Sequence, residues 1–283
     1  MNMPCYLTVD VEEYYNILDV PGEIPFEQWK DQKRLLPGNL ERLLELFDRH
    51  GVKVTMFVLG YFAEQYPELI RRCHDAGHEI ASHGYAHVLA YKVGREAFAE
   101  DIRRGKAVLE NIISEPVLGF RAAGFSTTDD SRWTFDEVRK AGYLYDASVF
   151  PSSRGHGGMK SSGLHPYRIQ TSAGELLEIP QSMIRIGWKR ICLFGGGYLR
   201  LAPLPLIVWG TRRLQKNHTP FVLYVHPREI DPTHPRLAMN MFRRFKSYVN
   251  LKSTYPKLDY ICGHFPIVQM RSLLAAEAQY PQA

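Results

Sequence analysis

Cysteine is scarce in this sequence, and no cysteine motif is present. The chain of 283 residues contains only Cys5, Cys73, Cys192 and Cys262, and no two of them form a C-x-x-C pair. This wide spacing argues against a disulfide framework and fits reduced, buried thiols in a cytosolic protein. We therefore predict a cytoplasmic location.

Long apolar runs are also absent. The first residues, MNMPCYLTVDVEE, contain no basic region followed by an apolar stretch, so we expect no secretory signal. The longest apolar stretch, LAPLPLIVWG at 201–210, is too short and too rich in proline to cross a bilayer. The sequence therefore predicts no transmembrane segment.

Blocks of like charge are missing as well. The formal net charge is +5, but Lys and Arg are spread along the chain, which argues against a nucleic-acid partner. The positive excess would suit an anionic substrate or a weak association with a membrane surface. Nothing in the sequence indicates the oligomeric state. The composition, 45% hydrophobic and 23% charged, is that of an ordinary globular protein.

What is present is a repeated unit: an amphipathic helix, a glycine and a short β-rich run. Gly51, Gly77 and Gly142 stand where left-handed C-caps would end three of the helices. The predicted helices, each with the strand that follows it, are 40–51 with 52–60, 66–77 with 78–84, 95–113 with 116–124, and 133–142 with 143–149. This alternation predicts a parallel sheet with helices outside it, open or closed into a barrel.

The second half of the sequence continues without a linker, so we predict a single domain over residues 1–283. Strands are expected at 175–183 and 221–227. The segment between them, 187–206, is rich first in glycine and then in proline, and we interpret it as a loop insertion and a helix start. Two further helices are predicted at 237–251 and 266–279.

Polar residues follow the predicted strands where each one ends. Because parallel strands place their carboxyl ends at one edge of a sheet, we expect these residues to converge on one mouth. They are Asp10 with Glu12, His83 with His87, Arg121, Asp146 and His226.

The densest polar stretch is HEIASHGYAH, residues 78–87. It is similar to the zinc-protease motif H-E-x-x-H, but three residues separate Glu79 from His83, one too many for that motif. His83 and His87 have the i, i+4 spacing that lets two imidazoles reach one ion. We assign His78 a structural role because it begins the strand.

Two carboxylates at the end of the first strand complete the pattern of a metal site. Asp10 and Glu12 lie two residues apart, and two histidines plus one carboxylate leave a position for water on a catalytic metal. The second carboxylate would then take the proton of that water. Spacing alone does not say which of the two binds the ion.

Further groups could act on a substrate. Arg121 could clamp a carboxylate in two-point geometry, and the small residues after it leave backbone N–H groups accessible to an oxyanion. His226, paired with Asp146 at a neighbouring strand end, would have a raised pKa and could protonate a leaving amine.

Taken in order, five motifs resemble those of the polysaccharide deacetylases of the NodB-homology type, carbohydrate esterase family 4: TVDVEE, HGYAH, GFRAAGFS, YDASVFP and YVHP. The resemblance covers residues 5–230. Residues 231–283 look like the C-terminal extension of the subgroup found in exopolysaccharide and exosortase-associated loci. The resemblance implies a distorted (β/α) barrel with a C-terminal helical extension, one divalent metal ion, usually Zn²⁺, and hydrolysis of an N-acetyl group of an amino sugar.

Carried over by position, the resemblance gives each residue a role. Asp10 would be the catalytic base, and Glu12, His83 and His87 would bind the metal. Arg121 would hold Asp10, the Gly124 amide would bind the oxyanion, and Asp146 would tune His226 as the acid. The sequence departs from the family pattern at three places: Gly84 replaces a Ser or Thr, Ala122 and Ala123 replace a proline motif, and Glu12 replaces an aspartate.

The resemblance implies an acetylated amino-sugar substrate, either a polysaccharide or its nucleotide- or lipid-linked precursor in O-antigen, capsule or exopolysaccharide assembly. Tyr85 and Phe125 could stack on sugar rings. Two alternatives stay open: a cyclic amide or ureide amidohydrolase of the same fold, and a catalytically silent barrel that binds glycan.

Overall fold

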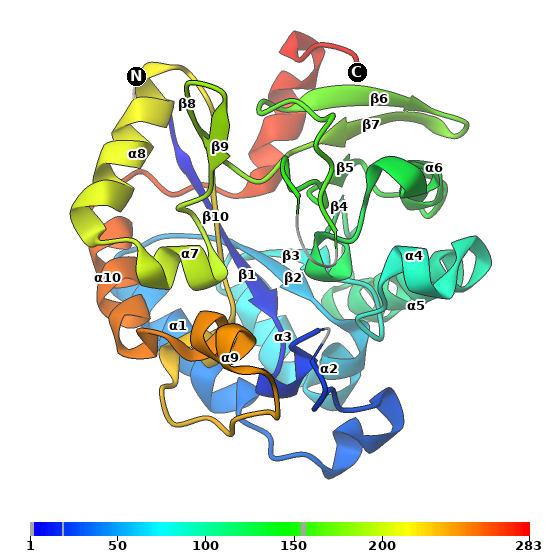
Figure 1. Cartoon of the computed structure of the whole chain (residues 1–283). Helices are drawn as coiled ribbons and strands as arrows, with labels where there is room; N and C mark the ends of the chain where they lie inside the picture. Colours follow the sequence, from blue (N-terminus) through cyan, green and yellow to red (C-terminus); the bar gives the residue numbers. More distant parts are fainter. Residues whose placement is uncertain (1–2, 19, 154–156) are drawn as a thin grey trace.

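A computed structural model describes residues 3–18, 20–153 and 157–283 (Figure 1). Its centre is a curled sheet of eight strands, whose order across the sheet is β10-β1-β2-β3-β4-β5-β7-β6. All neighbouring strands are parallel except β6, which runs antiparallel to β7. The strands are β1 Cys5–Val11, β2 Thr55–Val58, β3 Glu79–Ser82, β4 Gly119–Phe120, β5 Tyr145–Asp146, β6 Tyr167–Thr171, β7 Gly174–Glu178 and β10 Phe221–Val225.

Helices surround the sheet and connect its parallel strands (Figure 1). Strand β1 is buried at every position, as expected of a parallel strand that is covered on both faces. The helices are α1 Leu36–Arg49, α2 Gly60–Gln65, α3 Pro67–Asp75, α4 Ala90–Val93, α5 Arg95–Ile113, α6 Trp133–Lys140, α7 Gly196–Leu201, α8 Leu204–Lys216, α9 Met241–Tyr248 and α10 Thr254–His264. The prediction of a distorted (β/α) barrel is confirmed, in the form of a curled half-barrel.

The predicted left-handed C-caps at three glycines are confirmed. Gly51, Gly77 and Gly142 have φ angles of 61°, 88° and 87°, in the left-handed region that glycine adopts without a steric penalty. Each lies just after a helix and turns the chain toward the next strand. The four helix-to-strand units therefore have the boundaries that the sequence predicts to within a few residues.

The second half differs from the prediction in several segments. The expected loop at 187–206 contains β9 (Lys189–Ile191), paired with β8 (Ile184–Ile186) in a hairpin, and then α7. The hairpin turns at Gly187, whose φ is 58°. The helix start near 204 is correct. The helix predicted at 266–279 is a 3-10 helix, Met270–Gln279, and α10 was not predicted.

The C-terminal segment packs against the first strand. The Cys5 amide donates to the Pro266 carbonyl at 2.8 Å, and the Val268 amide donates to the Cys5 carbonyl at 3.0 Å. Met270 and Leu273 join Tyr6 in a hydrophobic cluster on one face of the sheet. Within the part of the chain that the structure describes, no helix has both the length and the hydrophobicity needed to cross a membrane.

Candidate metal-dependent active site

The ends of β1 and β3 bring three metal-ligating groups together. Glu12 Oε1 lies 3.0 Å from Nε2 of His83 and 3.0 Å from Nε2 of His87, and all three side chains are buried. The sequence left open which carboxylate of β1 stands between the histidines, and the geometry selects Glu12. Burial alone would raise the pKa of Glu12, but His87, His226 and His83 together lower it well below its usual value.

The three residues fit a divalent cation. Their ligand atoms lie within 4.8 Å of one another. His83 Nδ1 lies 2.7 Å from the Arg121 carbonyl, which fixes the ring with Nε2 toward Glu12. Nε2 of His87 is buried and has Glu12 Oε1 as its acidic neighbour, as expected of two atoms that would share an ion. His87 also has a φ of 55°, a strained conformation of the kind found at functional sites.

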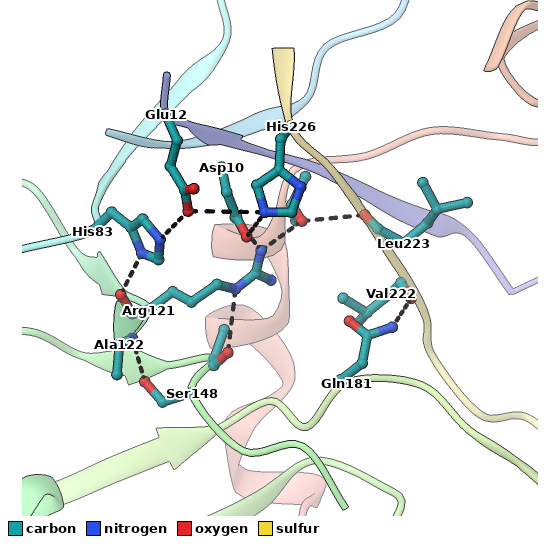
Figure 2. Close-up of polar contacts among 12 residues, drawn as sticks. Asp10, Glu12, His83, Arg121, Ala122, Ser148, Gln181, Val222, Leu223 and His226 are labelled. Carbon is teal, nitrogen blue, oxygen red and sulfur yellow. Dashed lines mark hydrogen bonds and ion pairs between the residues drawn. The ribbon is translucent and has the colours of Figure 1, made fainter. Parts of the chain in front are cut away.

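Asp10 is held by Arg121, as the family resemblance implied (Figure 2). Arg121 Nη1 donates to Asp10 Oδ1 at 2.6 Å and to the Thr8 hydroxyl at 2.8 Å. Nε of the same guanidinium donates to the Ala147 carbonyl at 3.2 Å. Arg121 is only 1% exposed, so this is a buried, hydrogen-bonded ion pair that fixes one carboxylate oxygen.

His226, after β10, faces the same carboxylates. Its Nε2 lies 3.9 Å from Asp10 Oδ2 and 3.8 Å from Glu12 Oε1 (Figure 2). Its Nδ1 lies 3.3 Å from Glu229 Oε2, and the His226 amide donates to that same oxygen at 3.1 Å. Glu229 therefore orients His226. The sequence held a signal for it, because a glutamate three residues after a chain turn is the spacing of a capping box.

The predicted pairing of Asp146 with His226 is wrong. Strands β5 and β10 are separated by four strands of the sheet, so the two side chains have different neighbours. Burial lowers the pKa of His226 to about 4, with a further contribution from Arg228, whereas the sequence analysis expected the pKa to be raised.

Asp146 instead belongs to a second carboxyl pair, with Glu178. The Ser148 hydroxyl donates to Asp146 and accepts from the Ala122 amide at 2.7 Å, while Glu178 accepts from the Val149 amide at 3.0 Å. Burial raises the pKa of Asp146 to about 6 and that of Glu178 well above its usual value. The pair therefore supports the loop that follows Arg121, through Ser148.

The loop between the two metal-ligating histidines is held by an acid that sequence reasoning missed. Asp101, on α5, accepts from the amides of Tyr85 and Ala86, at 2.9 Å each. At Gly84, φ is +79°, and an added Cβ would lie 2.5 Å from Asp101 Oδ2. The glycine that departs from the family pattern thus makes room for a carboxylate brace from a neighbouring helix.

Gly124 and Phe125 line a pocket of about 320 Å³ that also contains all the metal-ligating groups. Gly124 has a φ of 59°, within a short 3-10 turn that follows Arg121. Tyr85, which the sequence predicts to contact the substrate, is not among the residues that line this pocket. Its hydroxyl donates to Glu64 at 2.7 Å, and the Arg104 guanidinium lies over its ring, 3.5 Å from the centroid.

The lining of the pocket includes several cations. Its lining residues come from both halves of the chain: Asp10, Glu12, Asn16, Ile17, Leu18, His83, His87, Ala122, Gly124, Phe125, Ser153, Gly196, Gly197, Tyr198, Arg200, Leu201, Tyr224, His226, Arg228, Glu229, Arg243, Lys246 and Ser247. Arg228, Arg243 and Lys246 are among the lining cations. The C-terminal half therefore supplies one wall of the site.

Comparison with known families agrees with this geometry. Residues 26–145 match the family model described as Polysaccharide deacetylase, and residues 147–275 match a model described as Domain of unknown function (DUF3473). The first half of the chain is therefore similar to the polysaccharide deacetylase family. Asp10 and Glu12 lie before the first matched range, whereas His226 lies within the second.

Curated relatives match a limited part of the chain. A peptidoglycan deacetylase-like protein of Gibberella zeae is 31% identical over 110 residues, 38% of this chain and 32% of the relative. A peptidoglycan-N-acetylglucosamine deacetylase of Bacillus cereus is 30% identical over 107 residues, 38% of this chain and 48% of the relative. The matched region thus spans about a third to a half of the length of these relatives.

Solved structures share the fold across nearly the whole chain. A candidate polysaccharide deacetylase from Mycobacterium smegmatis has a TM-score of 0.66 and 21% identity, and the match covers 100% of this chain and 94% of the other. A candidate polysaccharide deacetylase from Pseudomonas aeruginosa has a TM-score of 0.63 and 17% identity, covering 96% and 89%. The allantoinase Puue has a TM-score of 0.60 and 18% identity, covering 96% and 88%. At these identities the likeness establishes the fold alone.

Proposed function

We propose that this protein is a metal-dependent hydrolase that removes an N-acetyl group from an amino sugar. One observation carries the proposal: Glu12, His83 and His87 meet around one point, beside a second carboxylate, Asp10, that is held by Arg121. This is the combination that amide hydrolysis requires, namely a site for a Lewis acid and a separate base.

The ion that we propose is Zn²⁺, held by Glu12 Oε1 and by Nε2 of His83 and His87. Two imidazole nitrogens and one carboxylate oxygen are a donor set typical of catalytic zinc. When bound, the cation polarises the acetyl carbonyl and lowers the pKa of a water molecule.

The residues around this position have separate tasks in the hydrolysis. Asp10 Oδ2, left free by the Arg121 contact to Oδ1, takes a proton from the attacking water as its oxygen bonds to the carbonyl carbon. The N–H of Gly124 is available to the oxyanion. The carbon–nitrogen bond then breaks, and the amine nitrogen takes a proton from His226. His226 Nε2 lies 3.9 Å from Asp10 Oδ2, so a bridging water is needed for the proton taken up by Asp10 to reach His226 and then the amine.

We propose that the substrate is a polysaccharide or its nucleotide- or lipid-linked precursor, of the kind used in O-antigen, capsule or exopolysaccharide assembly. Arg228, Arg243 and Lys246 line the pocket, and their charge would suit the phosphate of a carrier. Phe125 lines the same pocket and could stack on a sugar ring. The cytoplasmic location predicted from the cysteines remains a prediction.

The test is mass spectrometry of acetylated amino-sugar substrates after incubation with zinc-loaded protein. We expect products lighter by one acetyl group and an equal amount of acetate. The His83→Ala control should lose both metal and activity. His226→Ala should keep the metal, while its kcat falls roughly 10²- to 10⁴-fold, the usual contribution of a proton-transfer residue.

Two other outcomes would replace this proposal. Turnover of cyclic ureides, without turnover of N-acetylhexosamines, would assign the chain to the ring-opening amidohydrolases. Glycan binding without metal uptake or hydrolysis would assign it to catalytically silent barrels. Neither alternative has a supporting observation of its own, since the likeness to an allantoinase extends only to the fold.

A further inference from the structure

The second half of the chain exposes an unusual concentration of apolar side chains. Within the described ranges, ten of the fourteen large hydrophobic residues that are exposed lie on the β8–β9 hairpin and on helices α7, α8 and α9. We call this set the apolar face. Its members are Ile186, Trp188, Ile191, Tyr198, Leu201, Leu206, Trp209, Met241, Phe242 and Phe245.

These elements are neighbours in the fold. The hairpin packs on α8, and α7 packs on α9. Arg213 of α8 donates to the Arg185 carbonyl of the hairpin, and Arg200 of α7 donates to the Lys246 carbonyl of α9 at 2.7 Å. Figure 1 shows these elements together on the near side of the molecule, with the hairpin above α7 and α9 below it. The apolar face is therefore larger than the scattered exposed residues of an ordinary surface.

The same region carries only positive charge. Between Glu178 and Glu229 the sequence has eight Lys or Arg residues and no Asp or Glu, and between Asp231 and Asp259 it has six Lys or Arg residues and again no acid. The chain as a whole has 35 basic and 30 acidic residues, so the excess of positive charge comes from this region.

Cations and rings of the apolar face lie against one another. Lys189 Nζ is 4.9 Å from the centroid of the Trp188 ring, and Lys246 Nζ is 4.5 Å from that of Phe242. The Arg213 guanidinium is 5.7 Å from the ring of Trp209. Amphipathic side chains in this arrangement can place apolar groups into an acyl layer while their charged ends stay at the level of lipid headgroups.

The apolar face also reaches the mouth of the candidate active site. Tyr198 and Leu201 belong to both the face and the lining of the pocket, and Lys246, which lies against Phe242 of the face, also lines the pocket. A surface that bound this face would therefore lie beside the pocket entrance.

We propose that the apolar face docks onto a lipid bilayer that contains acidic phospholipids, with the pocket opening toward the headgroup layer. A bilayer fits better than a glycan, because Ile186, Leu206 and Met241 are aliphatic side chains that offer no ring on which a sugar can stack. It also fits better than a second copy of this chain, because two uniformly positive faces would repel each other. This docking goes beyond deacetylation and does not depend on it.

The experiment is co-sedimentation of the full chain with vesicles of phosphatidylcholine alone and with vesicles that contain equal parts of phosphatidylglycerol. We expect binding to the acidic vesicles that weakens as salt is added. Trp209→Ser should weaken this binding roughly tenfold, since a half-exposed indole would no longer enter the bilayer. Its control is Tyr91→Ser on α4, because the two side chains are 43% and 41% exposed and Tyr91 lies outside the apolar face.

Charge is tested separately with a matched pair of double variants. Lys189→Glu combined with Arg213→Glu should reduce binding to acidic vesicles more than 20-fold, at roughly fivefold for each positive charge that is lost. Arg72→Glu combined with Arg103→Glu changes the net charge by the same amount on other helices and should leave binding nearly unchanged.

Three results would overturn the proposal. One is the absence of binding to either type of vesicle, and another is equal loss of binding in the face variants and their controls. The third is that the protein binds polysaccharide, or self-associates in sedimentation velocity runs, and that Trp209→Ser removes this interaction while vesicle binding persists. Vesicle binding needs no turnover, so a failure to bind vesicles would not contradict the proposed hydrolysis. A failure to hydrolyse the substrate would likewise not contradict the proposed vesicle binding.

Discussion

The molecule contains two pairs of buried carboxyl groups at the carboxyl ends of its strands, and the two pairs have opposite environments. Asp10 and Glu12 lie in the pocket, where Arg121 and the histidines surround them. Asp146 and Glu178 lie behind the loop that follows Arg121 and have hydroxyl and amide donors close by. The pKa of Glu12 is lowered, whereas the pKa values of Asp146 and Glu178 are raised.

This difference shows that burial by itself does not decide the charge of a carboxyl group. Burial acts to raise the pKa of both Glu12 and Glu178, and only Glu12 has enough positive neighbours to reverse that effect. The pocket pair is therefore suited to binding a cation and accepting protons. The other pair is suited to holding a loop in place. Four substitutions test this comparison.

The largest effect is expected from Glu12→Gln. The amide keeps the size of the side chain but loses the negative charge that holds the ion between His83 and His87. Loss of a residue that only hydrogen-bonds to a metal ligand lowers metal affinity by roughly 10- to 100-fold. Loss of the ligand Glu12 should lower zinc affinity by more than this, and activity should disappear. Metal content after dialysis and acetate release measure the two effects. Full metal retention would show that Glu12 is not a ligand.

The second effect is expected from Asp10→Asn. This variant should still bind metal, because Glu12 and the histidines remain, but kcat should fall roughly 10²- to 10⁴-fold because the base is lost. The protein should also be less stable, by about 3–5 kcal/mol, because the buried Arg121 charge is left unpaired. Asp146→Asn is the matched control in the other carboxyl pair, and its metal content and kcat should stay near the starting values. A comparable kcat loss in both variants would contradict the assigned roles.

An intermediate effect is expected from Asp101→Ala, which removes the brace of the histidine loop. With the Tyr85 and Ala86 amides no longer held, the spacing of His83 and His87 should loosen, and zinc affinity should fall by roughly tenfold. Activity should return when excess zinc is added, since the chemical groups remain. Asp101→Asn keeps one acceptor oxygen, so its zinc affinity should lie between that of the parent protein and that of Asp101→Ala. If excess zinc fails to restore activity, the brace does not act through the metal site.

The smallest effect is expected from Glu178→Gln, and it depends on pH. A raised carboxyl pKa means that the folded protein retains a proton that the unfolded chain releases. In the unfolded chain the pKa values of both groups are near 4, and in the folded protein they are higher. The pair therefore destabilises the folded state, and this effect grows as the pH rises from about 4 through the pKa values of the folded protein.

The neutral amide removes this cost. We expect Glu178→Gln to be more stable than the parent protein by about 1–3 kcal/mol at about pH 8, with the difference vanishing near pH 4. Thermal unfolding at both pH values measures it. A destabilised variant at the higher pH would mean that Glu178 is charged in the folded protein.

Much of the site could be predicted from the sequence because its parts are local. The helix, glycine and strand units set the direction of each strand, and a parallel sheet places all of their ends on one edge. The i, i+4 spacing of His83 and His87 and the two carboxylates at the end of β1 predicted a site of two histidines and one carboxylate, and the structure places Glu12 beside the histidines.

The rest depended on which segments lie side by side. Asp146 follows a strand just as Asp10 does, but it lies among Ser148 and Glu178 and has no contact with His226. Tyr85, between the two histidines, does not line the pocket, and its hydroxyl donates to Glu64 instead. Asp101 gives no signal of its function until α5 is placed beside the site, and the capping-box spacing of Glu229 does not show that it contacts His226.

The sequence by itself determined the order of helices and strands, the edge of the sheet that carries the polar residues and the two histidines of the metal-ligating set. These follow from hydrophobic periodicity and from residue spacing, which act over a few positions. The tertiary structure alone decided the partner of each buried charge. Such partners come from segments far apart in the chain, and the pKa of a buried group depends on the few atoms within hydrogen-bond distance of it.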